Sequence, residues 1–319
     1  MRLSPLFVGA ALAAARALAA EDCPAPALKI ESSAPAPRQG GIAVLTLWSS
    51  APLSRAVLAD GKHQAAMEPE PASGGLVLRA LWGIDFEAAV GAKSVGLEAF
   101  GHCGDDHPDS WKFRVASGNF PQQKLSVNPA YVEPPESEKE RIAHDREKVA
   151  AVWAAPPTPR VWDRAFVLPV EATPGGNFGA RRVFNGKTQS RHAGADLVAA
   201  AGTPIKAPAA GTVRLAEDLY FSGGTVIVDH GGDLFTTYFH MSRIDVKPGD
   251  RVRTGDVLGA VGATGRATGP HLHWGARLNG ARVNPLGLLK LPAWSTPAES
   301  GTLQLPDRSV RYAALSFSK

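Results

Sequence analysis

The chain has 319 residues, of which 44% are hydrophobic and 20% are charged. This length predicts two domains that each bury a core, and the even supply of apolar residues excludes global disorder. The formal net charge is +4 at pH 7, and it falls by two, to +2, if the first 20 residues with Arg2 and Arg16 are removed. A charge so nearly balanced gives no electrostatic reason to expect nucleic acid as a partner.

Residues 1–20 are predicted to be a signal peptide. The basic start at Met1-Arg2 precedes an Ala/Leu-rich run, and Ala17-Leu18-Ala19 has the small-x-small pattern of a cleavage site. The run is too short to span a bilayer, and no later segment has 18 uninterrupted apolar residues. We therefore expect an exported protein of the periplasm or cell envelope, without a stable membrane span. The competing interpretation is an ordinary N-terminal helix.

The two cysteines, Cys23 and Cys103, predict one disulfide bond, because an even count in an exported chain favours pairing. The alternative is two unrelated thiols. Cys103 lies in a polar cluster that runs from His102 to His107 and could hold a metal. A polar loop carrying a disulfide cysteine is the favoured interpretation, since this loop offers a single thiol and no rigid frame of matched ligands.

Residues 21–132 are predicted to form a small β-sandwich. Short apolar and β-branched runs alternate with Gly, Pro and Asp turns, and Asp60-Gly61 is a two-residue hairpin signal. The expected strands are Ile42–Trp48, a strand through Val57-Leu58, Leu76–Trp82, Ser94–Phe100 and Trp111–Val115.

Residues 133–159 change character and predict a helical linker. Ser137 and Glu140 fit a capping box, and Pro156 stops the helix. Ile142, Val149 and Trp153 fall near one helical face amid many charges. We therefore expect a helix that packs on one side and is solvated on the other.

Residues 160–291 are again strand-rich and glycine-rich, with no long helix expected. Thr225–Asp229 and Leu234–Phe239 predict a hairpin around Gly231-Gly232. Turns are expected at Lys247–Asp250 and Thr254–Asp256. Residues 292–319 are predicted to be a loosely attached tail with one strand near Val310.

Four of the nine histidines stand at informative positions in this second β region. His192-Ala-Gly-Ala-Asp196 places an imidazole and a carboxylate four residues apart, and Gly194 lets the backbone turn so that both point at one centre. His271-Leu-His273 puts two imidazoles on one face of a strand, with Leu272 turned into the core. His240 ends a predicted strand.

This set fits a catalytic zinc site. Such sites take three protein ligands from His and carboxylate and leave one position open for water. The two motifs can supply three ligands with one histidine left over, and His240 adds a second. The remaining imidazoles are suited to proton transfer and to stabilising charge on a substrate. Spacing alone does not say which imidazole takes which role.

The chain resembles the LytM/lysostaphin-type peptidoglycan metallopeptidases over roughly residues 178–285. The matching segments are Asn177 to Gly186, His192 to Leu197, Gly202 to Val213, Tyr238 to Ser242, Val246 to Asp250, Gly265 to His273 and Val283 to Pro285. The resemblance implies that His192, Asp196 and His273 bind Zn²⁺ and that His240 and His271 are the catalytic histidines. It also implies a β-sheet groove that holds the site.

The resemblance extends loosely to the upstream sandwich, which is similar to the immunoglobulin-like domain preceding some exported members. It implies an endopeptidase that cuts peptide cross-links and takes peptidoglycan peptide stems as partners. Thr188, Gln189 and Ser190 occupy a stretch in which some lysostaphin-like members have a tyrosine.

Two rival functions follow from the same motifs. Some proteins of this fold have lost zinc ligands and bind cell wall or activate other hydrolases, but here all five site positions hold the expected residue. The Val246–Asp250 turn also resembles biotin or lipoate carrier domains, yet Lys206 and Lys247 lack the acceptor pattern.

Arg181 and Arg182 are either surface charge or groove residues that meet substrate carboxylates. His230 is expected at a hairpin edge beside Gly231, and His63 and His144 are expected at the surface.

Overall fold

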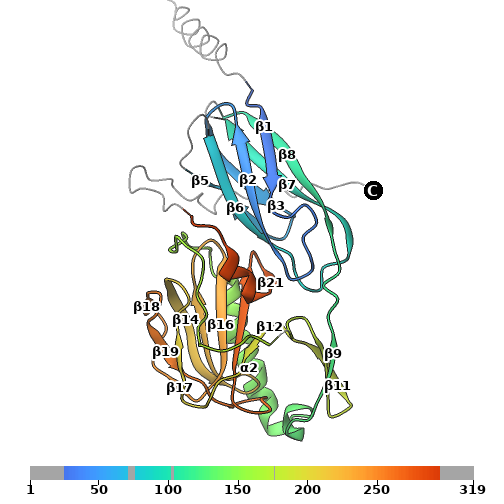
Figure 1. Ribbon diagram of the computed structural model, residues 1–319, viewed down its shortest axis with the longest axis vertical. Helices are drawn as coiled ribbons and strands as arrows, with labels where there is room; N and C mark the ends of the chain where they lie inside the picture. The colour runs from blue at the N-terminus through green and yellow to red at the C-terminus, as the bar shows by residue number, and fades with distance from the viewer. Residues whose placement is uncertain (1–24, 71–75, 102–103, 176, 295–319) are drawn as a thin grey trace, which may run out of the picture.

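The computed structural model describes residues 25–70, 76–101, 104–175 and 177–294 and shows a mainly β protein (Figure 1). The predicted signal segment, both cysteines and the predicted strand near Val310 lie outside these ranges, so the disulfide stays a prediction. Within these ranges no helix combines the length and the apolar character needed to cross a membrane.

The N-terminal unit consists of two four-stranded antiparallel sheets that pack face to face. The first has the order β1 (Leu28–Ser32), β2 (Ile42–Ser49), β6 (Leu76–Gly83), β5 (Glu68–Glu70). The second has the order β4 (Gln64–Ala66), β3 (Leu53–Ala59), β7 (Gly91–Gly101), β8 (Asp106–Val115). Every strand predicted in this region is confirmed, as is the turn at Asp60-Gly61, where Gly61 has a φ of +85°.

This sandwich has a core of its own. Strand β2 alternates buried and half-buried residues along most of its length, as expected for a strand with one face on the core. Its inward residues Leu45 and Leu47 pack against Leu58 and Leu97 of the opposite sheet. The core is therefore made by the period-two pattern that predicted the strands.

A connection then leads to helix α2. It contains β9 (Gln122–Leu125) and the short 3₁₀ helices η1 (Pro129–Tyr131) and η2 (Glu136–Glu138), before α2 at Lys139–Ala154. The predicted capping box is wrong, because no side chain caps η2 or α2. The chain enters α2 through η2, so Ser137 lies inside that turn rather than at its start.

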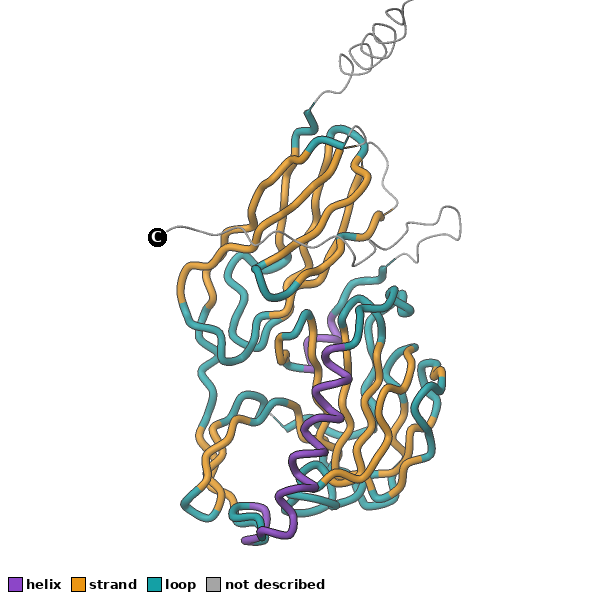
Figure 2. The backbone as a smooth tube through the Cα atoms, turned by 180° about the vertical axis from the view of Figure 1, so that it is seen from behind, coloured by secondary structure: helices purple, strands orange, loops and turns teal. Residues whose placement is uncertain are grey.

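Helix α2 lies along the outer face of the large C-terminal sheet (Figure 2). Val152 packs with Leu215 and Phe235, and the Trp153 ring meets the Phe235 ring edge-on at 5.3 Å. On the same side of the helix, Lys148 pairs with Glu217. The predicted one-sided packing is confirmed, and the surface covered belongs to the C-terminal unit.

The C-terminal unit is built on one long sheet. Its order is β12 (Gly194–Leu197), β20 (Leu272–Leu278), β16 (Leu234–Met241), β15 (Gly223–Asp229), β14 (Gly211–Leu219), β18 (Arg251–Val252), with β21 (Ala281–Val283) beside β20. A smaller sheet has the order β13 (Pro204–Lys206), β19 (Val257–Ala260), β17 (Arg243–Ile244), and a third the order β11 (Thr188–Arg191), β10 (Arg181–Phe184), β9. The last helical segment is η3 (Pro285–Lys290).

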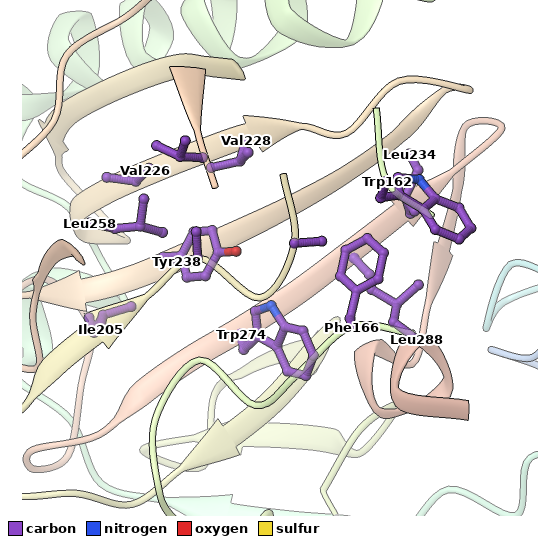
Figure 3. Packing of buried hydrophobic residues seen from close by; sticks show 14 of the residues in the cluster. Trp162, Phe166, Ile205, Val226, Val228, Leu234, Tyr238, Leu258, Trp274 and Leu288 are labelled. Atoms are coloured by element: carbon purple, nitrogen blue, oxygen red, sulfur yellow. The ribbon is translucent and has the colours of Figure 1, made fainter. Parts of the chain in front are cut away.

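The core of this unit lies on the face of the long sheet opposite α2 (Figure 3). Trp274 and Tyr238 are fully buried there, beside Ile205 and Leu258 of the smaller sheet. Leu272 is also fully buried, which confirms that it points away from its two flanking histidines. The predicted hairpin at Gly231-Gly232 is confirmed, and both glycines have positive φ.

The two units contact each other directly. Arg282 in β21 forms a two-pronged ion pair with Asp85 of the sandwich, at 3.0 Å for each prong, and also reaches Glu87 at 2.7 Å. The Asn284 amide donates to the Gly40 carbonyl at 2.8 Å. A side chain at Gly83 would meet the Leu278 carbonyl at 2.6 Å, so the backbones approach closely here.

Candidate metal centre

Three metal-ligating side chains meet at one end of the long sheet. Asp196 on β12 is the direct antiparallel partner of His273 on β20. The Asp196 Oδ1 and His273 Nδ1 atoms lie 3.2 Å apart. The His192 Nε2 atom lies 2.9 Å from the same oxygen and 2.8 Å from His273 Nδ1. In the part of the chain that the structure describes, these residues form the one group of His, Cys, Asp and Glu side chains placed to hold a metal ion.

The donor set fits zinc. Two imidazole nitrogens and one carboxylate oxygen are ligands that zinc takes in catalytic sites. Burial, the largest influence, lowers the pKa of His273 to about 4, so its imidazole is neutral at pH 7. Burial opposes the charge on Asp196, but contacts with His192 and His273 hold the pKa of its carboxyl well below the usual range. His273 and Asp196 therefore have the protonation that metal binding requires.

Backbone contacts fix the orientation of His192, which precedes β12. Its N–H donates to the Ala180 carbonyl at 2.9 Å, and its own carbonyl accepts from the Gly179 amide at 2.7 Å. Its Nδ1 lies 2.9 Å from the Asn177 carbonyl oxygen. Since a carbonyl can only accept, Nδ1 carries the proton and Nε2 presents its lone pair to the site.

The site needs a glycine at position 194 because of a close contact with another strand, and not because of the predicted backbone turn. Gly194 lies within β12 and does not have a positive φ. A Cβ at this position would lie 2.5 Å from His273 Nε2 and 2.6 Å from the Trp274 carbonyl oxygen. The glycine is therefore needed because the His273 ring passes directly over the neighbouring strand.

The second oxygen of Asp196 is held by the protein. Asn177 donates from Nδ2 to Asp196 Oδ2 at 2.8 Å, and Arg182 donates to the same oxygen. Arg182 also donates from Nε to Gln123 Oε1 at 3.2 Å, which ties β9 to the site. Of the two alternatives for Arg182, a position in the groove is confirmed, and the carboxylate that it pairs with in the structure is Asp196. Arg181 is exposed.

His240 and His271 lie beside the three-residue group. Their ring centroids are 4.8 Å apart, and His271 Nε2 lies 3.6 Å from Asp196 Oδ1. His240 donates from Nδ1 to the Thr264 carbonyl and His271 from Nδ1 to the Gly269 carbonyl, both at 2.8 Å. Each therefore keeps Nε2 as its free nitrogen. Burial lowers the pKa of His240 to about 3, with smaller contributions from His273 and His271.

The backbone at His240 is strained. Its φ is +65°, in the left-handed region that non-glycine residues rarely adopt. The β15–β16 register shifts between Gly224 and Val226, opposite this residue, and the His240 amide donates to the Ser222 carbonyl at 2.8 Å. Such a bulge re-aims a side chain, and strain held by surrounding contacts is typical of functional positions.

A groove of about 360 Å³ adjoins this group. Its walls come from the β9 segment, from β10 and from the loop before β20, and they include Gln123, Arg182, Asp196, Arg266 and His271. A larger cavity of about 560 Å³ lies where the sandwich meets η3, and no histidine lines it. The groove is the site on chemical grounds, since the His271 imidazole and the Asp196 carboxylate line it.

All five residues singled out from the sequence are thus brought together, and His271 and His273 do share one face. The residues that support them, Asn177, Arg182 and Thr264, were not assigned this role. Asn177 and Arg182 lie in one matching segment, Asn177 to Gly186, whereas no matching segment contains Thr264. His230, expected at a hairpin edge, is fully buried, and it bonds to Ala210 and Thr236. In the loop thought to carry a disulfide cysteine, Asp105 and His107 contact each other.

Comparison with known proteins finds relatives of this region. A sequence profile of Peptidase family M23 matches residues 190–285. Peptidoglycan DD-endopeptidase ShyC of Vibrio cholerae is 42% identical over 110 residues, which are 34% of this chain and 25% of ShyC. DD-carboxypeptidase/endopeptidase Mpg of Neisseria meningitidis is 42% identical over 97 residues, 30% of this chain and 22% of Mpg. The chain thus spans about a quarter of the length of these relatives.

One solved structure is similar over most of the chain. A putative peptidase M23 from Pseudomonas aeruginosa has a TM-score of 0.59 and 31% sequence identity. The alignment covers 81% of this chain and 95% of that one. The similarity therefore extends beyond the part matched by the family profile.

Proposed function

The chain belongs to peptidase family M23, and from this premise we propose that it is an exported zinc-dependent endopeptidase that hydrolyses peptide cross-links of bacterial peptidoglycan. The observation that carries the proposal is the convergence of His192 Nε2, Asp196 Oδ1 and His273 Nδ1 within 2.8 to 3.2 Å of one another. Metallopeptidases of this family are zinc-dependent.

His192, Asp196 and His273 would hold the zinc ion. Zinc bound there would act as a Lewis acid and make water a stronger nucleophile at neutral pH. Asn177 and Arg182 orient the Asp196 carboxylate by binding its other oxygen. Residues that fix metal ligands in this way tune metal affinity, so they belong to the proposed site.

His240 and His271 would act as proton carriers and charge stabilisers. With Nδ1 fixed by a backbone carbonyl, each keeps Nε2 available for a proton, and His271 also lines the groove. A neutral Nε2 accepts a proton from the attacking water, and the imidazolium so formed can return it to the leaving amine. Such an imidazolium also stabilises the negative charge that develops on the carbonyl oxygen of an amide under attack.

The substrate class is supported by ShyC of Vibrio cholerae, whose name describes an endopeptidase that acts on peptidoglycan. A non-catalytic module that binds cell wall or activates another hydrolase is the rival, but such a module has no need for five matched side chains. Action outside the cytoplasm is proposed from the predicted signal segment, residues 1–20. A directly cross-linked wall is favoured over one with glycine bridges.

The remaining segments complete the proposal. We assign residues 21–132 to an immunoglobulin-like sandwich, 133–159 to a helical linker, 160–291 to the peptidase domain and 292–319 to a tail. The two separate cores support the first and third assignments. The proposed linker helix is bound to the peptidase sheet through Val152 and Trp153.

The test is digestion of purified peptidoglycan, with products identified by mass spectrometry. The purified protein is incubated with directly cross-linked and glycine-bridged walls, each with and without a zinc chelator. Loss of cross-linked dimers that the chelator abolishes is expected for the first wall. Release of glycan fragments with every cross-link intact, or cleavage that no chelator affects, would refute the proposal.

A further inference from the structure

We propose that Arg266 binds a free carboxylate of the peptide substrate, an inference that rests on the proposed peptidase function and names what its groove recognises. Arg266 lines the same groove as Asp196 and His271. It is half-buried, and in the part of the chain that the structure describes no carboxylate pairs with its guanidinium. The groove therefore presents a cation without a counter-ion close to the proposed zinc ligands.

The guanidinium is held by aromatic rings rather than by an acid. Its central carbon lies 4.6 Å from the Phe184 ring centroid and 5.1 Å from that of Phe221. A stacked guanidinium keeps its N–H donors in its own plane, where they remain able to form the two parallel bonds that a carboxylate accepts. The two rings thus hold the Arg266 guanidinium in place and leave its N–H donors available to a ligand.

The electrostatic surroundings favour an anionic ligand. Burial lowers the pKa of Arg266, and the nearby positive charge of Arg182 lowers it further. The positive charge of Arg182 is itself neutralised by its ion pair with Asp196. A carboxylate entering the groove would therefore neutralise a partly desolvated cation that the protein leaves uncompensated.

The loop that carries Arg266 also fixes the proposed catalytic histidines. The Arg266 amide donates to the Phe221 carbonyl at 2.8 Å, and the Thr264 hydroxyl donates to the Met241 carbonyl at 2.8 Å. The Thr264 carbonyl accepts from His240, and the loop ends at His271, whose amide donates to Gly262 at 3.1 Å. A carboxylate bound at Arg266 would thus be held at a set distance from the imidazoles, and the scissile bond with it.

The ligand is therefore a peptide with a free carboxylate near the bond that is cut. That group could be a C-terminal carboxylate or a side-chain carboxylate. The experiment uses three synthetic cross-linked peptides: one with all carboxylates free, one with its C-terminal carboxylates amidated and one with its side-chain carboxylates amidated. Kinetics are measured for wild type, Arg266→Gln and Arg266→Lys. Arg277→Gln is the matched control, because Arg277 also stacks on an aromatic ring, Trp153, but does not line the groove.

We expect amidation of the recognised carboxylate to lower kcat/KM of the wild type about 10- to 100-fold, mainly through KM, since hydrogen bonds to charged groups have this strength. Arg266→Gln should cut all three peptides with the low kcat/KM that the wild type shows for the amidated peptide. Arg266→Lys should recover part of the preference for the free carboxylate. Arg277→Gln should keep the whole preference. Thermal melting and zinc content of each variant show whether fold and metal site are intact. Equal loss on all three peptides, or no loss, would overturn the role of Arg266.

Binding of the same peptides to chelator-treated protein, measured by calorimetry, gives a readout that needs no turnover. Affinity should fall when the recognised carboxylate is amidated, and only where Arg266 is present. If wild type cleaves peptides without regard to amidation, the carboxylate site fails while the peptidase function stands. If wild type cleaves nothing but binds in a carboxylate- and Arg266-dependent way, the peptidase function fails and the site stands. Binding and cleavage that both ignore amidation would refute the site.

Discussion

Asp196 and His273 face each other directly across the β12–β20 ladder, so the register of two strands alone brings a carboxylate and an imidazole to the same point. Opposite residues in an antiparallel pair point to the same face of the sheet. A rigid sheet thus sets the separation of two proposed ligands before any metal binds. His192, held by backbone bonds from Ala180 and Gly179, adds the third.

This arrangement predicts that the ligands can be removed without loss of the fold. His192→Ala and His273→Ala should each lose stoichiometric zinc, while circular dichroism stays that of the folded protein because the core lies on buried strands of the sheet. The measurement is metal analysis of the purified variants. His144→Ala is the control, since that side chain is exposed on α2. Stoichiometric zinc in both ligand variants would show that the assignment is wrong.

The close approach at Gly194 predicts a second effect on the metal. In Gly194→Ala the new Cβ would lie 2.5 Å from the His273 ring and 2.6 Å from a backbone oxygen, so the ring must shift. We expect weaker zinc binding and a loss of unfolding free energy of about 1–3 kcal/mol, as for other overpacked sites. Zinc titration and chemical denaturation measure the two effects.

Gly269→Ala is the matched control for that substitution, because a Cβ at Gly269 meets nothing within 4 Å and its φ is not positive. It should bind zinc as the wild type does. Wild-type zinc affinity in Gly194→Ala would contradict the proposed reason for the glycine.

His240 and His271 are predicted to matter for turnover and not for metal retention. His271→Ala and His240→Ala should keep zinc and lose activity by roughly 10²–10⁴-fold, the usual value of general acid–base help. His240→Asn is a second variant, since Asn adopts positive φ more readily than Ala and so tests the side chain with less backbone strain. Near-normal turnover in these variants would remove both histidines from the mechanism.

The strands and the five site residues could be predicted from the sequence, because short local patterns of residues indicate both. Alternating apolar residues in Ile42–Ser49 reveal a strand, and His-x-His places two rings on one face. What the patterns could not give was long-range. The contact that makes Gly194 necessary comes from β20, and the partner of Arg182 is a carboxylate on another strand.

The same limit explains the other corrections. A capping box at Ser137 agrees with local sequence, but η2 begins earlier and places that residue inside a turn. His230 is buried and its ring contacts that of Phe166, whose centroid is 4.8 Å away and which lies far off in the chain. The parallel pairing of β9 with β10 brings a segment from between the two units into the groove wall, and no local pattern marks it.

Asn177 is predicted to support the metal site through Asp196. Asn177→Ala removes the Nδ2 donor to Asp196 Oδ2 but keeps the backbone carbonyl that binds His192. Loss of such a supporting bond commonly lowers metal affinity 10- to 100-fold, so we expect a loss of about that size. Activity at saturating zinc should fall less. Asn128→Ala, which changes a bond to Ala130 outside the groove, is the control. Zinc affinity unchanged by Asn177→Ala would count against the role.

The buried His230 predicts that stability falls in acid. Its Nδ1 donates to the Ala210 carbonyl and its Nε2 accepts from Thr236, each at 2.7 Å, so the neutral form is fully satisfied. Burial lowers its pKa from 6.5 to about 4. Below about pH 6.5 His230 is protonated in the unfolded chain but stays neutral in the folded chain. The stability that neutral His230 contributes is therefore fully present above that pH and is lost as the pH falls toward 4.

The loss over that window is on the order of 3 kcal/mol if the whole shift contributes. Urea denaturation of chelator-treated wild type and His230→Gln, at pH 7 and pH 5, measures it. Other histidines titrate alike in both proteins, so the difference between the two pH dependences isolates His230. The variant should be less stable at pH 7 but lose less on acidification. If the variant does not fold, the pKa of His230 followed by NMR in the wild type replaces this comparison. Identical pH dependences, or a pKa near 6.5, would refute the prediction.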